Sequence, residues 1–427
     1  KMLFPFVLLL SLTGMLKAQV TTAGMSGKVM ADEESVIGAT VVAVHEPSGT
    51  SYGTVTNVDG RFSLQGMRSG GPYKVTVSYI GYQTAIYTGI QLQLGETYSL
   101  NVTLHEASEL LGEITITASK SKFSAEKTGA TTNISSEQLT TLPSINRSIS
   151  DFTRISPYAS GNSFGGRDGR SNTFTVDGAN LNNNFGLSSG LPGGGNPISL
   201  DAIDEVQVVI APYDVRQANF IGAGINAITK SGTNAYRGSA YMYFNNEVMR
   251  GNKIGDTDFG VRAEESKTVY GATFGGPIIK DKLFFFANVE YEKSPQQVIT
   301  WRAAKEGETP NNSTISRTTE ADLAEFSQIL KDKYRYNTGS FTDFPADVTN
   351  LKLLGRIDWN INQGNKLSVR YNFTNNKTWE APNGSSGNTG YRLAYNRVSA
   401  YSMSYANSCY SLQNIVNSAT AELNSRF

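Results

Sequence analysis

The stretch that decides the fold is Thr268–Tyr291, TVYGATFGGPIIKDKLFFFANVEY, in which two β-prone runs flank a short charged tripeptide. The runs Thr268–Ile278 and Leu283–Tyr291 each hold about the 9 to 11 residues that a tilted strand needs to cross a bilayer. The tripeptide KDK between them suits a tight turn. The stretch therefore predicts two adjacent antiparallel membrane strands.

The same pattern recurs on both sides of this stretch, with aromatic residues near the strand ends. By contrast, Ser294–Asn350 is long and polar and carries a helix-like patch at Leu323–Lys331. Short turns on one side and long loops on the other are typical of an outer-membrane barrel with the long loops outside. The other candidate strands are Arg237–Asn245, Leu351–Ile361, Lys366–Thr374, Val398–Ala406 and Ile415–Leu423.

These strands are too few to close a plugged barrel. An eight-stranded barrel is filled by its own side chains, whereas a barrel that encloses a folded domain needs about 22 strands. An open sheet would leave unpaired backbone groups in lipid, each costing several kcal/mol. We therefore expect residues 235–427 to be the first strands of an incomplete antiparallel transmembrane β-barrel, and the chain to be an N-terminal fragment.

Two strings upstream of the strands carry a family resemblance: FTVDGANLNN at Phe174–Asn183 and IDEVQVVIAPYDVRQANFIGAGINAITKSGTN at Ile203–Asn234. Both resemble plug-domain motifs of TonB-dependent outer-membrane receptors, in the variant of Oar-like receptors. The resemblance implies an α+β plug over residues 122–234. Within it, the residues themselves predict a short helix near Ser148–Arg154, whose extension Pro157 limits. The motif residues are Val176, Asp177, Gly178, Gly222 and Gly224.

Polar loops of the predicted plug are candidates for ligand contact. Arg167 and Arg170 lie beside flexible glycines in FGGRDGRSN, and Asn182 and Asn183 lie in an asparagine-rich run. These side chains either face the ligand or the charges of the barrel, or belong to solvated loops. Both interpretations remain open.

A β-prone run, ELLGEITITAS at Glu109–Ser119, lies in a linker at residues 109–121. Its position before the plug resembles that of a TonB box, which adds as a strand to an inner-membrane partner. The alternative is a last edge strand of the preceding domain. The residues chosen for the box are Glu113, Ile114, Thr115, Ile116 and Thr117.

Residues 22–106 read as short alternating strands separated by turn clusters, which predicts a small β-sandwich. Asn57-Val58-Asp59-Gly60 predicts a hairpin turn in which Gly60 takes a positive φ. The strings TNVDGRFSL and VSYIGYQT resemble the carboxypeptidase-regulatory-like domain that precedes many outer-membrane receptors of Bacteroidota. The whole chain is therefore expected to be mainly β.

The N-terminus predicts export. Lys1 precedes an apolar run, Met2–Leu16, that is shorter than the roughly 20 residues of a membrane helix. We expect a signal peptide at residues 1–18, cleaved after Ala18. Lys plus Arg and Asp plus Glu both total 37, so the charge gives no reason to expect a nucleic-acid partner.

No enzyme chemistry is visible in the sequence. GNSFG around Ser163 matches a nucleophile elbow, but both histidines, His45 and His105, precede it. The GAGINA string from Gly222 lacks the following helix that a dinucleotide site requires. Two histidines and one cysteine cannot assemble the usual zinc sites. We expect no enzyme activity, no metal site and no cofactor.

The resemblance implies a function at the cell's outer membrane. It implies import of a ligand with energy from the inner-membrane proton gradient, with the N-terminal domain and the TonB box in the periplasm. The implied partners are a TonB-type energy-coupling complex, outer-membrane lipid, an extracellular ligand of unknown identity and a surface lipoprotein. The alternative is a binding or adhesion protein on the same scaffold that transports nothing.

Overall fold

The computed structural model describes residues 20–31, 33–106, 114–117, 130–144, 147–182, 196–212, 217, 220–258, 265–295, 299, 301–311, 314–381 and 399–425. No helix within these ranges is both long and apolar enough to cross a membrane. The expected signal peptide, residues 1–18, lies outside the described residues, which begin at Val20.

The first domain, called the sandwich below, is built from two β-sheets. One has the order β2-β1-β5, with β8 and β9 both parallel to β1, and the other has the order β10-β7-β6-β3-β4. The strands are β1 (Ala23–Ala31), β2 (Glu34–Ser35), β3 (Thr40–His45), β4 (Thr50–Val55), β5 (Arg61–Met67), β6 (Gly70–Ser78), β7 (Ala85–Leu92), β8 (Thr97–Ser99), β9 (Val102–Leu104) and β10 (Ile114–Thr117).

The sandwich core comes from the alternation of side chains along its strands. In β5, Phe62 and Leu64 are buried while Ser63 between them is exposed, because successive side chains of a strand point to opposite faces. They meet Met25 from β1 and Tyr73 and Val75 from β6 in one apolar cluster.

The turn at Asn57–Gly60 forms, but the hairpin predicted for it is wrong. The Gly60 N–H donates to the Asn57 carbonyl at 2.9 Å, and Gly60 has a φ of +71°. However, β4 pairs with β3 and β5 pairs with β1, so the turn joins strands of different sheets. Both strands place apolar side chains in the core between the two sheets. This favours a chain that crosses from one sheet to the other at the turn.

The second domain, called the plug domain below, has one mixed sheet of order β11-β16-β17-β14-β15. Its helix α3 confirms the helix predicted near Ser148–Arg154, and it buries Ile149 and Phe152. The elements are β11 (Ala130–Ser135), α2 (Ser136–Thr141), α3 (Ile149–Thr153), β12 (Ala159–Ser160), β13 (Ser163–Phe164), β14 (Thr173–Val176), β15 (Ala179–Asn180), β16 (Ile203–Ile210) and β17 (Gly224–Thr229), with short 3-10 turns η2 (Gly169–Ser171) and η3 (Leu200–Ala202).

The third part, called the barrel sheet below, is a six-stranded antiparallel sheet of order β18-β21-β22-β25-β26-β27. Among the described residues the two end strands, β18 and β27, do not pair with each other, so the sheet is open. Its strands are β18 (Arg237–Asn246), β21 (Ser266–Ile279), β22 (Leu283–Lys293), β25 (Thr349–Asn360), β26 (Asn365–Glu380) and β27 (Tyr410–Ser425).

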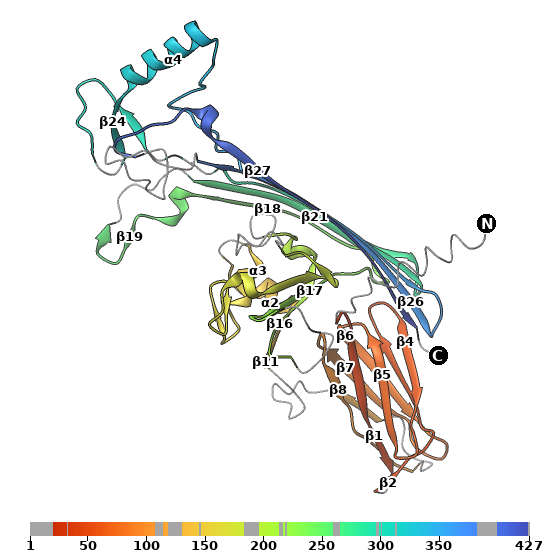
Figure 1. The fold of residues 1–427 in the computed structure, drawn as a ribbon. Helices are drawn as coiled ribbons and strands as arrows, with labels where there is room; N and C mark the ends of the chain where they lie inside the picture. Colours follow the sequence, from red (N-terminus) through yellow and green to blue (C-terminus); the bar gives the residue numbers. More distant parts are fainter. Residues whose placement is uncertain are drawn as a thin grey trace, which may run out of the picture.

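Connections between these strands are short at one end of the sheet and long at the other. Figure 1 shows the long ones, with α4 and β24, at the end away from the sandwich. One predicted strand, Val398–Ala406, is wrong: Ser399 and Ser402 form an isolated bridge, and Ala406 begins a 3-10 turn. The long connections contain η4 (Glu247–Arg250), β19 (Lys253–Ile254), β20 (Thr257–Asp258), β23 (Arg302–Ala304), β24 (Ile315–Thr319), α4 (Glu320–Tyr334) and η5 (Ala406–Ser408).

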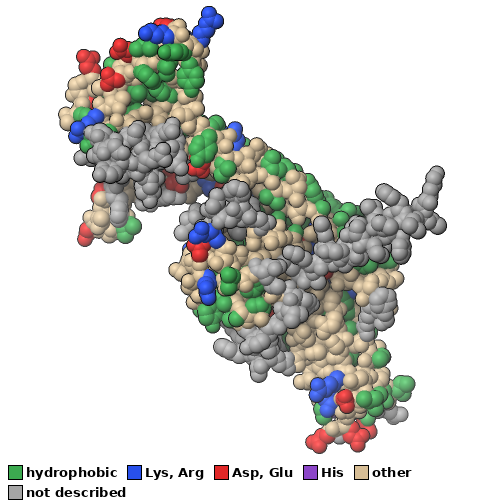
Figure 2. Space-filling model, in the orientation of Figure 1, with side chains coloured by type: hydrophobic (Ala, Val, Ile, Leu, Met, Phe, Trp, Pro, Cys, Tyr) green, Lys and Arg blue, Asp and Glu red, His purple; other side chains and the backbone are tan. Residues whose placement is uncertain are grey.

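The two faces of the barrel sheet differ in chemistry. On the outer face, large apolar side chains such as Val289, Ile357 and Val369 are exposed, and Figure 2 shows hydrophobic side chains gathered along this part of the molecule. On the other face, the neighbouring positions Arg356 and Arg370 are polar and buried. Apolar-out and polar-in alternation is the pattern of a membrane barrel strand.

The plug domain packs against the inner face of the barrel sheet (Figure 1). Phe286 of β22 and Leu354 of β25 belong to the same apolar cluster as Phe174 and Val206 of the plug domain. The two parts therefore share one hydrophobic core. Its packing sets the relative position of the two parts, and so which polar side chains meet between them.

Candidate functional site

The predicted motif residues Val176, Asp177 and Gly178 form a tight turn between β14 and β15. Asp177 and Gly178 have φ values of +48° and +81°, and Asp and Gly are residues that tolerate this left-handed backbone. The Asp177 carboxylate accepts hydrogen bonds from the Thr229 backbone N–H at 3.0 Å and from its hydroxyl at 2.6 Å. The turn thereby ties the end of β14 to the end of β17.

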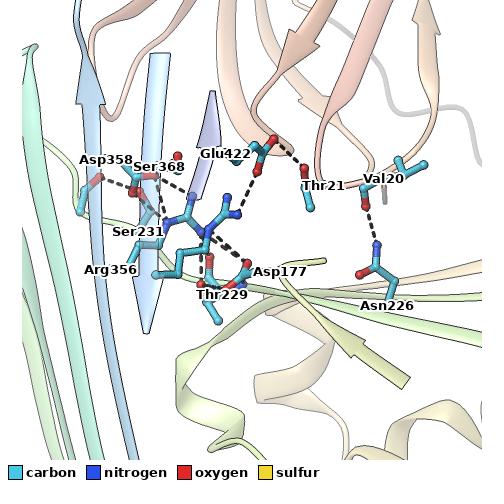
Figure 3. Close-up of polar contacts among 12 residues, drawn as sticks. Val20, Thr21, Asp177, Asn226, Thr229, Ser231, Arg356, Asp358, Ser368 and Glu422 are labelled. Atoms are coloured by element: carbon cyan, nitrogen blue, oxygen red, sulfur yellow. Dashed lines mark hydrogen bonds and ion pairs between the residues drawn. The ribbon is translucent and has the colours of Figure 1, made fainter. Parts of the chain in front are cut away.

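Two arginines of the barrel sheet, Arg356 and Arg370, reach this turn, and Figure 3 shows Arg356 beside Asp177 and Thr229. The nearest guanidinium nitrogens of Arg370 and Arg356 lie 3.6 Å and 3.9 Å from Asp177 Oδ1. Arg356 also donates to the Thr229 carbonyl oxygen at 2.5 Å. All three charged side chains are more than nine-tenths buried, so the pairing spans the boundary between plug domain and barrel sheet.

Each arginine has a second carboxylate on the barrel sheet itself. Arg356 pairs with Asp358 at 2.8 Å, and Arg370 pairs with Glu422 at 2.9 Å. A buried charge without a partner is strongly unfavourable. The second carboxylates therefore compensate the charge of both arginines within the barrel sheet itself, in addition to the contact with Asp177.

The other motif residues, Gly222 and Gly224, provide close packing. A Cβ added at Gly222 would collide with the Asn172 side chain, and one added at Gly224 would lie 2.7 Å from the Phe220 ring. Asn172 Oδ1 accepts the backbone N–H of Ala223 at 3.0 Å. The glycines let β17 enter the sheet beside β14, with which it pairs in parallel.

A second polar contact joins the plug domain to the first strands of the barrel sheet. The Ser199 hydroxyl donates to Glu290 Oε2 at 2.8 Å, and the Tyr241 hydroxyl donates to the same oxygen at 2.8 Å. Glu290 Oε1 accepts from Lys352 at 2.8 Å. The Arg147 guanidinium of the plug domain lies 3.8 Å from the centre of the Tyr243 ring. The plug domain is thus held at two separate places.

The predicted ligand-facing residues take different positions. Arg167 and Arg170 are exposed, and Arg170 pairs with Asp168 at 2.9 Å. Asn182 is half-buried and its Oδ1 accepts the Phe174 backbone N–H at 2.6 Å, so its side chain holds the β14–β15 turn. Asn183 lies outside the described residues.

The predicted TonB-box segment forms the edge strand β10 of the sandwich. Ile114–Thr117 pairs in parallel with Ala85–Thr88 of β7, which is the placement that the edge-strand alternative describes. Glu113 lies outside the described residues. The structure does not bring this segment into contact with the Asp177 turn in any described interaction.

Within the described ranges, no group of three or more His, Cys, Asp and Glu side chains is placed to hold a metal ion. Sequence reasoning missed the functional side chains that the barrel sheet supplies, above all Arg356, Arg370 and Glu290. A signal for them was present. Each is a charged residue next to an apolar residue in a predicted membrane strand, and such a residue must face away from lipid and find a partner.

Comparisons with known proteins agree with this architecture. A family model described as a carboxypeptidase regulatory-like domain matches residues 24–105, and one described as an outer membrane beta barrel domain matches residues 228–426. The TonB-dependent transporter Oar of Myxococcus xanthus is 25% identical over 344 residues, covering 76% of this chain. The chain spans 30% of the length of that transporter.

Solved receptor structures show weaker likeness. The ferric enterobactin receptor PfeA of Pseudomonas aeruginosa, in complex with enterobactin, has 15% identity and a TM-score of 0.40, covering 62% of this chain and 36% of that one. The siderophore receptor PirA of Acinetobacter baumannii has 18% identity and a TM-score of 0.37, covering 58% and 31%. The matches to a carboxypeptidase regulatory-like domain, to an outer membrane beta barrel domain and to a TonB-dependent transporter support a TonB-dependent receptor of the outer membrane.

Proposed function

We propose that the receptor to which this chain belongs actively imports a ligand, using energy that a TonB-type complex transmits from the inner-membrane proton gradient. The observation that carries the proposal is the buried contact between Asp177 and the arginines Arg356 and Arg370. Each arginine keeps a second carboxylate, but the buried Asp177 carboxylate would be separated from both of these cations, which is unfavourable. A plug held in this way needs an outside source of work before a ligand can pass.

The strand β10 supports the proposal as the point where that work enters. It is an edge strand that pairs along only four residues of β7. A short edge strand can leave its sheet and offer its backbone donors and acceptors to another protein by strand addition. We therefore assign Glu113–Thr117 as the TonB box, which leaves β7 when the partner binds.

The proposed orientation follows from the ends of the barrel sheet. The sandwich and β10 lie at the end with short turns, which in outer-membrane barrels faces the periplasm. The long connections are then available to the ligand from the other side. We propose the loops of Arg167, Arg170, Asn182 and Asn183 as the ligand-facing part of the plug domain, and a surface lipoprotein as a further partner at the long connections.

A backbone substitution in β10 tests the assignment in the full-length receptor. Because strand addition uses backbone N–H groups, Ile116→Pro and deletion of Glu113–Thr117 should both abolish binding to the periplasmic domain of the TonB protein and energised uptake. Ligand binding at the cell surface should remain. The matched control Ile116→Ala keeps the N–H group and should retain most of the binding, measured by calorimetry. Unchanged TonB binding after the deletion would refute the box.

The competing candidate, an adhesion protein without transport, predicts a different response to energy. Collapsing the proton gradient with an uncoupler should stop ligand accumulation by an importer. It should leave surface binding by an adhesin as it was. Accumulation that persists in uncoupled cells would refute active import while leaving the family assignment intact.

A further inference from the structure

The turn between β7 and β8 of the sandwich inserts into the plug domain. Leu94 at its tip is fully buried. It belongs neither to the apolar cluster of the sandwich nor to that of the plug domain. Its backbone N–H donates to both carboxylate oxygens of Glu205 at 3.1 Å, and its carbonyl accepts from Gln207 Nε2 at 2.6 Å. A Cβ at Gly95 would lie 2.8 Å from that same Nε2 atom. The turn therefore fits closely against the plug domain through its backbone.

The plug strands that the turn contacts are β16 and β11. Glu205 and Gln207 lie on β16, and Asn133 lies on β11. Asn133 Nδ2 donates to the Leu94 carbonyl at 3.4 Å and to Glu96 Oε1 at 3.2 Å. In the described sheet, β11 is the edge strand and pairs with β16 alone. It is also the plug strand nearest to β10 along the chain, so a pull on β10 reaches β11 first.

The sandwich is anchored to the barrel sheet as well as to the plug domain. Figure 1 shows it below both parts, and Figure 3 shows Val20 facing Asn226 and Thr21 facing Glu422. Val20 O accepts from Asn226 at 2.5 Å and the Thr21 hydroxyl donates to Glu422 at 2.7 Å. Further hydrogen bonds join Pro47 O to Asn234 N (2.9 Å), Thr50 Oγ1 to Asn360 Nδ2 (3.0 Å) and Ser51 O to Lys366 Nζ (3.4 Å).

We propose that the sandwich is a clamp on the plug domain. Anchored on the barrel sheet, it holds β11 against β16 through the turn at residues 93–96, so the plug domain cannot unzip from this edge until the sandwich is displaced. This clamping role is distinct from import, because the clamp holds the plug domain in the resting receptor too. Only its release by a pull on β10 rests on the proposed function.

Channel opening in urea tests the clamp without any ligand or energy source. The full-length receptor is placed in a planar lipid bilayer, and K⁺ conductance reports opening of the plug domain as urea is raised. Asn133→Ala combined with Gln207→Ala removes the side-chain donors to Leu94. Loss of these hydrogen bonds should raise the opening rate at a fixed urea concentration by roughly tenfold to hundredfold. Gln65→Ala, which removes only a bond within the sandwich to Ser63, should change nothing.

A reversible cross-link tests the clamp in the opposite direction. Glu96→Cys and Asn133→Cys, in a Cys409→Ser background, are joined with a short cleavable thiol-reactive linker. The linked receptor should stay closed in urea that opens the unlinked one, and reduction of the linker should restore opening. A linked pair within the sandwich, Ser63→Cys with Gln65→Cys, should open normally. Equal opening rates for the wild-type, doubly substituted and linked receptors would overturn the clamp. TonB binding and uptake would still be judged separately by the β10 variants.

Discussion

At Glu205 a carboxylate lies buried between two domains. Its burial raises the pKa to about 8, although the hydrogen bond from the Leu94 N–H lowers it, and the nearby carboxylates Asp204 and Glu96 raise it further. When the sandwich leaves, Glu205 meets water and its pKa returns toward the ordinary value of 4.5. Between these two values the clamped state holds a proton that the released state lacks. The clamp is therefore most stable below pH 4.5 and weakens as the pH rises to about 8.

This linkage predicts a pH dependence of opening in the urea assay. Between pH 5 and pH 8 the equilibrium should shift toward the open receptor by up to about tenfold per pH unit. Glu205→Gln cannot titrate and keeps an oxygen acceptor for the Leu94 N–H, so its opening should vary much less with pH. A wild-type receptor that opens more readily at pH 5 than at pH 8 would contradict the sign of this effect.

The residues of the site were only half predictable from the sequence. Asp177 was found because it lies in a motif whose turn demands its backbone conformation. Its partners Arg356 and Arg370 lie far along the chain on different strands, and the sequence shows only that each faces inward. Which plug residue they meet depends on how two domains pack, and that information is not local. The partner of Arg170, by contrast, is local in the sequence, since Asp168 is only two residues away.

At the scale of elements, the pairing of β18 with β21 supports the second plug contact. Tyr241 lies directly across from Gly271, and a Cβ at Gly271 would enter the space of the Tyr241 ring. Gly271→Ala should therefore displace the ring from Glu290 and lower the free energy of unfolding by about 1–3 kcal/mol. Gly355→Ala is the matched control, because its added Cβ would meet nothing within 4 Å. Thermal unfolding of the detergent-purified receptor measures both, and equal midpoints would contradict the role of the glycine.

The long strands of the barrel sheet were the elements that the sequence predicted well. Leu283–Tyr291 falls inside β22, and Lys366–Thr374 falls inside β26, which runs further at its C-terminal end. The strand expected at Val398–Ala406 failed because alternation over a few residues is also met in irregular loops that pack against other loops. Tyr405, for example, donates its hydroxyl to the Leu323 carbonyl of α4 at 2.7 Å. Helix α4 itself, with Thr319 as its N-cap, confirms the helix-like patch predicted at Leu323–Lys331.

At the scale of the whole molecule, the docking of the sandwich is what the sequence could not reveal. Its interface consists largely of backbone groups, such as the Leu94 N–H and carbonyl, and of single polar side chains from three parts of the chain. Such contacts leave no periodic pattern. In the proposed clamp these contacts would pass a pull on β10 to the plug domain, because the sandwich carries β10 on one sheet and the plug-binding turn at the end of the neighbouring strand β7.

The orientation of the molecule in the membrane gives the last prediction. Gly307, in the connection between β23 and β24, and Gly81, in the sandwich, both lie in exposed turns with positive φ and open space around them. A short epitope inserted after either residue should therefore leave the fold intact. The long connections end away from the sandwich (Figure 1), so the epitope at Gly307 should bind antibody on intact cells. The epitope at Gly81 should bind only after the outer membrane is permeabilised. Immunoblots of whole lysates confirm equal expression, and antibody binding at Gly81 on intact cells would reverse the proposed orientation.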